Sequence, residues 1–256
     1  MSRAKLNDLI DNEKFEHYYQ ALYDLDTLEP IGYEALLRTN LYKNPELLFE
    51  QASTTDRFYE LECKSIKNAL ASFNELITKQ YNRIKILINV FPANLKHPDF
   101  LAHLLEFMEN KKFEPKQVII EINESDILNK ADDLTVYVQE LKDAGFLIAI
   151  DDVGKGVSSL QAIVELQPDY VKMDRYFANQ LATSSRKQEM VRSIVTYCLN
   201  TDTKFVLEGV EIPEDLEMAK SIGVSIVQGF LLAVPLPIDK IKLYQKTLEE
   251  AEEQYE

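Results

Sequence analysis

The sequence predicts a protein of the α/β class, in which strands and helices alternate around one closed barrel. Strand-like runs alternate with runs of helical periodicity along most of the 256 residues. No linker rich in Pro, Gly or Ser divides the chain, and its length fits a single barrel. Acids or amides also follow six of the strand-like runs, which is where such barrels gather functional side chains.

Eight strands are expected in chain order, and helical runs separate all but the first two. Those two are joined by the short turn Asp26–Pro30, so they should pair antiparallel, whereas the others should be parallel. We therefore predict a modified TIM (β/α)₈-type barrel with an antiparallel first strand. The expected strands are 15–24, 30–37, 84–90, 117–122, 146–151, 169–173, 204–209 and 224–231.

The expected helices follow the 3.6-residue period of apolar positions. Gly145 and Gly223 stand where helices should end, and Pro213 stands at a first helical position. The acidic stretch 241–256 should form a solvated C-terminal helix, so that 1–256 is one domain. Two clear apolar stripes are Leu101, Leu104, Leu105 and Met108, and Leu134, Val138 and Leu141.

The charge and the apolar content of the sequence argue against two kinds of partner, nucleic acid polymers and membranes. The formal net charge of −15 repels polyanions, so no nucleic acid polymer is expected as a ligand, although cations could let a small phosphorylated ligand bind. No run approaches the ~18 apolar residues of a membrane span, and the N-terminus lacks an apolar signal region. We therefore expect no membrane insertion and a cytoplasmic location.

The cysteines and histidines are not expected to carry chemistry. Cys63 and Cys198 each lie on an apolar helical stripe, which predicts buried free thiols rather than a disulfide. His17, His97 and His103 sit in no cluster along the sequence, so we assign them no role.

Oxygen-bearing side chains at the strand ends predict a divalent-metal site. Hard oxygen ligands favour Mg²⁺ or Mn²⁺, and strand ends meet at one mouth of a barrel. Asp151 and Asp152 follow an apolar run, where two neighbouring carboxylates repel each other unless a cation is present. These strand-end residues are Glu34, Asn89, Glu121, Asp151 with Asp152, Asp174 and Glu208.

Gly154-Lys155-Gly156 matches neither of two common nucleotide-binding patterns. It lacks the earlier glycine and following Ser or Thr of a P-loop, and Ser159 stands where the dinucleotide pattern requires glycine.

Short motifs in a fixed order carry a resemblance to a known family. They are Tyr19-Gln20, Glu34-Ala35-Leu36-Leu37-Arg38, Asn89, Glu121-Ile122-Asn123-Glu124-Ser125, Asp151-Asp152, Gly154, Gly156 with Ser158-Ser159-Leu160, Lys172-Met173-Asp174-Arg175, Glu208-Gly209-Val210-Glu211, Gln228-Gly229-Phe230 and Pro235-Leu236-Pro237. Over roughly residues 6–240 the chain resembles the EAL-domain family of cyclic di-GMP phosphodiesterases.

The resemblance implies a site with two Mg²⁺ or Mn²⁺ ions and a catalytic group made of Asp152, Lys172 and Glu208. Lys172 would position the attacking water, although a plain ion pair with Asp174 or another acid is the alternative. Glu208 would act as general base or mainly as a metal ligand. The first ion would be held by Glu34, Asn89, Glu121 and Asp151, and the second by Asp151, Asp152 and Glu208.

The resemblance also implies substrate contacts. Arg38 suits a phosphate because its planar fork donates two hydrogen bonds, with a surface ion pair as the alternative. Ser158 and Ser159 open a helix and would cap it or contact phosphate. Glu124 would support the neighbouring loop. The full set of expected substrate-binding residues is Gln20, Arg38, Asp174, Glu211 and Gln228.

The chain departs from the family pattern behind the aspartate pair. Val153 and Val157 replace two aromatics, Lys155 replaces a Thr or Ala, and Asn123 replaces a Thr. The expected function is metal-dependent hydrolysis of cyclic di-GMP to linear pGpG, by a homodimer. The altered loop keeps an alternative open, a catalytically weak or inactive cyclic di-GMP receptor that acts through a partner protein.

Overall fold

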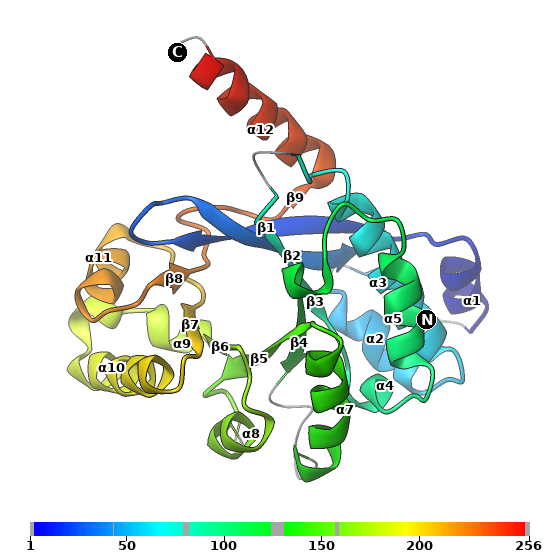
Figure 1. The fold of residues 1–256 in the computed structure, drawn as a ribbon, viewed down its shortest axis with the longest axis horizontal. Helices are drawn as coiled ribbons and strands as arrows, with labels where there is room; N and C mark the ends of the chain where they lie inside the picture. Colours follow the sequence, from blue (N-terminus) through cyan, green and yellow to red (C-terminus); the bar gives the residue numbers. More distant parts are fainter. Residues whose placement is uncertain (1–2, 43, 79–81, 124–130, 157–158, 254–256) are drawn as a thin grey trace.

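The computed structural model describes residues 3–42, 44–78, 82–123, 131–156 and 159–253. The strands form one mixed sheet closed into a barrel, with helices around its outside (Figure 1). The strands are β1 Glu16–Asp24, β2 Pro30–Arg38, β3 Lys85–Asn89, β4 Val118–Asn123, β5 Leu147–Val153, β6 Tyr170–Met173, β7 Lys204–Leu207, β8 Ile226–Val227 and β9 Leu236–Pro237.

Strands β2 to β8 are parallel neighbours, and β1 closes the barrel by pairing antiparallel with both β2 and β8. The predicted fold class and the antiparallel first pair are therefore confirmed. The expected strand 224–231 is reduced to Ile226–Val227. The chain turns at Gly229, where a Cβ would lie 2.0 Å from the Val210 carbonyl oxygen, so backbone contact ends the strand.

The short β9 was not predicted. It spans only Leu236–Pro237 and pairs with Tyr18 and Tyr19 of β1. Two residues give no alternating pattern, and a proline is depleted in strands, so the sequence carries no strand signal there.

The helices lie in the connections between strands, apart from the N-terminal and C-terminal ones. Gly145 and Gly223 follow α7 and α11 with positive φ, as expected of helix ends, and Pro213 opens α11. The helices are α1 Arg3–Asp11, α2 Glu46–Ser53, α3 Phe58–Phe73, α4 Pro92–Leu95, α5 Phe100–Met108, α7 Ala131–Asp143, α8 Ser159–Leu166, α9 Arg175–Ala178, α10 Ser185–Asn200, α11 Pro213–Ser221 and α12 Ile238–Glu253.

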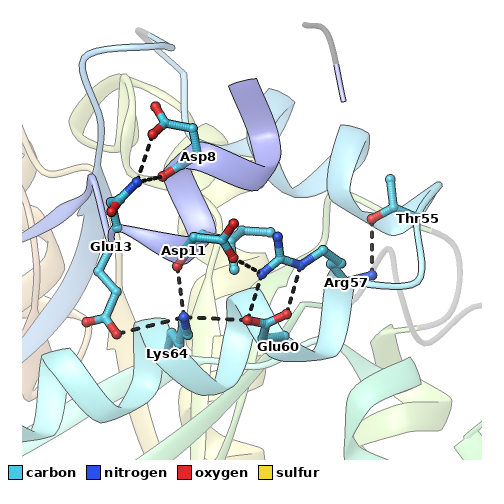
Figure 2. Close-up of polar contacts among 9 residues, drawn as sticks. Asp8, Asp11, Glu13, Thr55, Arg57, Glu60 and Lys64 are labelled. Carbon is cyan, nitrogen blue, oxygen red and sulfur yellow. Dashed lines mark hydrogen bonds and ion pairs between the residues drawn. The ribbon is translucent and has the colours of Figure 1, made fainter. Parts of the chain in front are cut away.

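Helix α1 is attached to α3 by a mixed apolar and ionic contact. Leu9 and Ile10 are fully buried in a cluster that includes Leu61 of α3. Figure 2 shows the ionic part, in which Arg57 lies between Asp11 and Glu60, at 2.5 and 2.8 Å. Such partly exposed pairs contribute little individually, so the buried apolar residues carry most of the attachment.

One apolar layer fills the barrel interior. Each member comes from a different strand, and together they plug the barrel below its C-terminal mouth. Side chains two positions further along each strand point to the same interior. The plug consists of Leu22, Leu87, Ile119, Ala149, Tyr170, Val206 and Ile226. Within the described chain, no helix combines the length and apolar character needed to cross a membrane.

Candidate active site

The candidate site is the polar layer directly above the apolar plug. Counting two residues on from the plug residue of each strand from β3 to β8 reaches an acid, an amide or a lysine, and counting two back along antiparallel β1 reaches Gln20. On β2, which has no plug residue, Glu34 lies two positions after Gly32. The layer is Gln20, Glu34, Asn89, Glu121, Asp151, Lys172, Glu208 and Gln228. The structure thus brings together side chains that lie up to 208 positions apart in the sequence.

Lys172 stands at the centre of this layer. Its side chain has no solvent exposure, and its Nζ lies 2.6 Å from Glu121, 2.8 Å from Glu208, 3.1 Å from Asp151 and 3.4 Å from Glu34. Lys172 does not pair with Asp174, which was one suggested partner. It does pair with other acids, as the broader alternative proposed.

One ammonium cannot satisfy four carboxylates, because it has only three N–H donors. Glu121 Oε1 and Asp151 Oδ1 are buried, and Lys172 Nζ, at 2.6 and 3.1 Å, is the only polar partner that the described residues offer them. The layer therefore holds more carboxylate oxygen than its own cation can neutralise.

The pKa values follow from this imbalance. Burial raises the pKa of Glu121 and Glu208 well above the usual range and also raises that of Asp151, with neighbouring carboxylates adding to the effect. Burial disfavours the charged form of Lys172 as well, but the surrounding carboxylates outweigh it and raise its pKa well above the usual value. A bound cation would therefore stabilise the ionised carboxylates of the layer.

Amides fix the position of Glu34. Gln228 Nε2 donates to its Oε2 at 2.8 Å, and Asn89 Nδ2 donates to its Oε1 at 3.2 Å. Burial opposes ionisation of Glu34, but Lys172 and these two amides together lower its pKa. Glu34 is thus held as a carboxylate at the mouth of the barrel.

Asp152 faces a different set of partners from Asp151. Its backbone is left-handed, with φ of 58°, which turns the chain as β5 ends. Its Oδ2 accepts from Asn123 Nδ2 at 2.7 Å and lies 3.2 Å from Lys155 Nζ. Burial opposes ionisation, but these donors lower the pKa of Asp152. Two of the residues that depart from the family pattern, Asn123 and Lys155, are its principal partners.

Of the remaining predicted residues, Gln20 belongs to the layer, Asp174 contacts Asp152 and Glu211 is exposed. Gln20 is buried in the layer and donates to the Ala233 carbonyl at 3.0 Å. Asp174 caps α9 by accepting from Tyr176 N at 2.8 Å, and Glu211 is exposed in the loop after β7. Glu124 lies outside the described residues.

Arg38 lines the cavity above the layer. This cavity has a volume of about 1060 Å³ and also contacts Glu34, Asn89, Glu121 and Asp151. The Arg38 guanidinium donates to the Leu37 carbonyl at 2.9 Å and lies over the Tyr18 ring. Among the described residues it makes no ion pair, so the suggested surface ion pair is absent.

The donor chemistry of the layer fits divalent cations. Buried carboxylate oxygens that share a single ammonium are ligands that Mg²⁺ and Mn²⁺ accept. Over the described residues, no three His, Cys, Asp or Glu side chains are already arranged to hold one ion, because Lys172 occupies the space between them. The layer therefore fits divalent cations in its negative charge and in the type of its donor atoms.

Comparison with known proteins decides the family. A family model described as EAL domain matches residues 3–235. The chain belongs to the EAL domain family.

Relatives in this family include enzymes and a regulator. The chain is 29% identical over 238 residues to the probable cyclic di-GMP phosphodiesterase PdeN of Escherichia coli, covering 90% of the chain and 45% of PdeN. It is 27% identical over 205 residues to the blue light- and temperature-regulated antirepressor BluF of the same organism, covering 79% and 50%. The chain thus spans at most half the length of these relatives.

Solved EAL domain structures share the fold. The PaMucR phosphodiesterase in complex with c-di-GMP has a TM-score of 0.84 at 26% identity, covering 93% of this chain and 98% of that one. Klebsiella pneumoniae BlrP1 in a complex with manganese and cyclic di-GMP has a TM-score of 0.80 at 29% identity, covering 88% and 57%.

Outside this layer, the structure brings together two histidines that form no cluster along the sequence. His97 and His103 are not isolated, because both contact Tyr59. The His97 ring stacks on Tyr59 at 3.6 Å, and Tyr59 Oη lies 2.9 Å from His103 Nδ1. His97 and His103 lie 38 and 44 positions after Tyr59, so local sequence patterns do not predict this contact. Cys63 and Cys198 are free thiols, as predicted, but only Cys198 is fully buried, whereas Cys63 is partly exposed.

Proposed function

We propose that this EAL domain hydrolyses cyclic di-GMP to linear pGpG with two bound Mg²⁺ or Mn²⁺ ions. The observation that carries the proposal is the polar layer, whose acids outnumber their cation on the floor of a cavity of about 1060 Å³. That volume is at the upper end of ligand pockets. PdeN and the PaMucR complex support the choice of cyclic di-GMP as ligand.

The proposed ligand sets follow the layer. Glu34, Asn89, Glu121 and Asp151 would hold the first ion, and Asp151, Asp152 and Glu208 the second. Bound in this way, such ions supply a hydroxide near neutral pH and stabilise the leaving oxygen.

The other site residues have binding and charge roles in the proposal. Arg38 donates to a phosphate oxygen of the substrate, while Gln20 and Gln228 orient the nucleotide and Asp174 and Glu211 line its path. Lys172 offsets negative charge that develops on the phosphate. Glu208 takes a proton from water or serves only as a ligand. Glu124, which lies outside the described residues, would support the neighbouring loop.

The test compares wild type with Glu34→Ala and Asp151→Ala. Wild type incubated with cyclic di-GMP and Mg²⁺ or Mn²⁺ should release pGpG, measured by chromatography. Each variant should lose release almost completely, because it lacks a ligand of the first ion. Turnover that persists in EDTA, or in both variants, would refute the two-metal mechanism.

A receptor without turnover is the second candidate. The Lys155–Asp152 contact at 3.2 Å places a competing cation on a proposed metal ligand, and the relatives include an antirepressor, BluF. Tight binding of cyclic di-GMP with no pGpG from wild type, in either metal, would establish this function instead.

A homodimer remains part of the proposal. Leu160 and Val164 on α8, the helix after β5, expose 66% and 58% of their surface and offer an apolar contact. Light scattering that shows only a monomer at micromolar concentration would contradict it.

A further inference from the structure

A second cavity lies beside the candidate site and shares Lys155 with the cavity above the polar layer. It has a volume of about 540 Å³, within the range of small-ligand sites. Three of its lining side chains are cationic, Lys155, Arg175 and Lys187, and one is acidic, Asp174. In a chain with a net charge of −15, this local excess of positive charge is unusual.

We infer that this cavity binds a nucleoside monophosphate, with Arg175 and Lys155 contacting its phosphate and Tyr176 beside its base. The ligand class includes a free mononucleotide and the phosphorylated end of a linear dinucleotide. The inference does not depend on the proposed hydrolysis.

Arg175 is the main phosphate donor in this inference. Its side chain is exposed into the cavity, and over the described residues it makes no hydrogen bond or ion pair. A guanidinium presents a rigid fork that matches a phosphate in two parallel hydrogen bonds. An unengaged arginine in a cationic cavity is therefore free to take that role.

The short helix α9 is held so that Arg175 and Tyr176 keep their positions. A Cβ at Gly209 would lie 2.2 Å from Arg175 Cβ, and a Cβ at Gly154 would lie 2.4 Å from the Phe177 ring. Both glycines also have positive φ. Only glycine permits this approach of α9 from two sides, so the cavity wall is positioned by backbone contact.

Lys187 of α10 is attached to the α9 segment that lines the cavity. Its Nζ donates to the carbonyls of Tyr176 and Asn179, each at 2.5 Å, and lies 4.2 Å from the Tyr176 ring centroid. The ring is 63% exposed and offers a face on which a base can stack. Asn179 and Gln180 supply amide groups at the rim, which can hydrogen-bond base edges.

Lys155 connects this cavity to Asp152. Its Nζ lies 3.2 Å from Asp152 Oδ2, yet its side chain remains 60% exposed and lines the second cavity. A phosphate at Arg175 would compete with Asp152 for the same ammonium. Binding of a ligand in the second cavity should therefore change the affinity of Asp152 for a metal cation. This consequence rests on the proposed function.

Calorimetric titration of the full chain with GMP in EDTA tests the site. GMP should bind at millimolar or lower concentration, whereas guanosine should not, because the cations require a phosphate. Arg175→Ala and Lys155→Ala should each weaken GMP binding roughly ten-fold, the scale of a lost charge-assisted hydrogen bond. Arg186→Ala, which removes an exposed neighbouring charge outside the cavity, should leave it unchanged.

Several outcomes would overturn the inference. They are no GMP binding at 10 mM (roughly the weak limit of specific sites), equal affinity in Arg175→Ala and wild type, or loss of binding in Arg38→Ala, which would place GMP in the barrel mouth. Inorganic phosphate binding as tightly as GMP would overturn the nucleotide assignment. Because these titrations contain no metal, their failure is distinct from a failure to hydrolyse cyclic di-GMP.

The coupling is measured separately as the affinity for Mn²⁺ with and without GMP. Linkage requires a changed Mn²⁺ affinity in wild type and an unchanged one in Lys155→Ala. Identical Mn²⁺ affinities in wild type would overturn the coupling.

Discussion

At the scale of single residues, Lys172 has the largest expected effect on stability. Lys172→Met leaves the layer with buried carboxylates and no cation, and breaking a buried pair in this way costs about 3–5 kcal/mol. Urea unfolding in EDTA should show this loss, and Mn²⁺ should restore part of it by replacing the missing charge. Lys204→Met, which alters the exposed start of β7, is the matched control. Equal midpoints for Lys172→Met and wild type would contradict the central role of the ammonium.

Arg38 should govern affinity for cyclic di-GMP. Removing a hydrogen bond to a charged group costs about 1.5–3 kcal/mol, so Arg38→Ala should bind at least roughly ten-fold more weakly. Arg38→Lys keeps the charge without the planar fork and should lie between the two. Titration at fixed salt measures all three, and unchanged affinity in Arg38→Ala would mean that the guanidinium does not face the ligand.

His17 should make stability depend on pH. It is buried beside Ser65, with 3.0 Å between His17 Nε2 and Ser65 Oγ, and burial, assisted by Arg38, lowers its pKa from 6.5 to about 4. Between these values the unfolded chain binds a proton that the native chain does not. The free energy of unfolding should therefore fall as pH drops from 6.5 to 4, by about 3 kcal/mol from this residue.

The measurement for His17 is urea unfolding at a series of pH values. His17→Gln lacks the titrating group, so its stability should decline less than that of wild type across this interval. The two proteins are compared above pH 7, where the histidine is neutral in both states, to set the baseline. Parallel curves from pH 7 to 4 would show that His17 is protonated in the native protein.

Most acids of the polar layer could be predicted because they follow apolar strand-like runs and also match the family motifs, as Glu34, Glu121 and Glu208 do. Gln20 and Gln228 were predicted from the family resemblance only. The central placement of Lys172 could not be predicted, because it depends on the stagger of eight strands around a closed barrel. The same holds for Asn123, whose contact with Asp152 joins neighbouring strands.

At the scale of elements, the link from β4 to β5 should control the second metal position. Asn123 donates to Asp152 across these strands at 2.7 Å. Asn123→Ala removes this donor, and such changes around a ligand reduce metal affinity roughly 10–100-fold. Mn²⁺ titration should detect the loss, whereas Asn123→Thr, the family residue, should retain part of the affinity. Wild-type affinity in Asn123→Ala would assign Asp152 to another role.

Helices and strands with long apolar patterns were predictable, and short elements were not. The stripes of α5 and α7 and the buried β3 and β4 follow local sequence. The end of β8 depends instead on the backbone contact between Gly229 and Val210, and β9 on its pairing with β1. Both are contacts between distant segments, which local periodicity does not record.

At the scale of the whole molecule, divalent cations should stabilise the fold. A ligand that binds only the native state at 100 times its Kd adds about 2.7 kcal/mol, which for a domain of this size raises Tm by roughly 5–10 °C. Thermal unfolding with Mg²⁺ or Mn²⁺, against EDTA, measures the shift. Asp151→Ala and Glu34→Ala should show little of it. A rise of the same size in those variants would place the bound ions elsewhere.

The reversed direction of β1 has a consequence for protein engineering. Glu16 pairs with Arg38, so the beginning of β1 lies at the mouth, while the turn after its end lies at the opposite rim. Leu28 in that turn is 59% exposed. A fluorescent domain inserted at Leu28 would sit on the far rim from the cavity, and it should leave ligand access open. The same domain inserted between α1 and β1 would lie beside Arg38, where it would report on ligand binding in the cavity or block ligand entry.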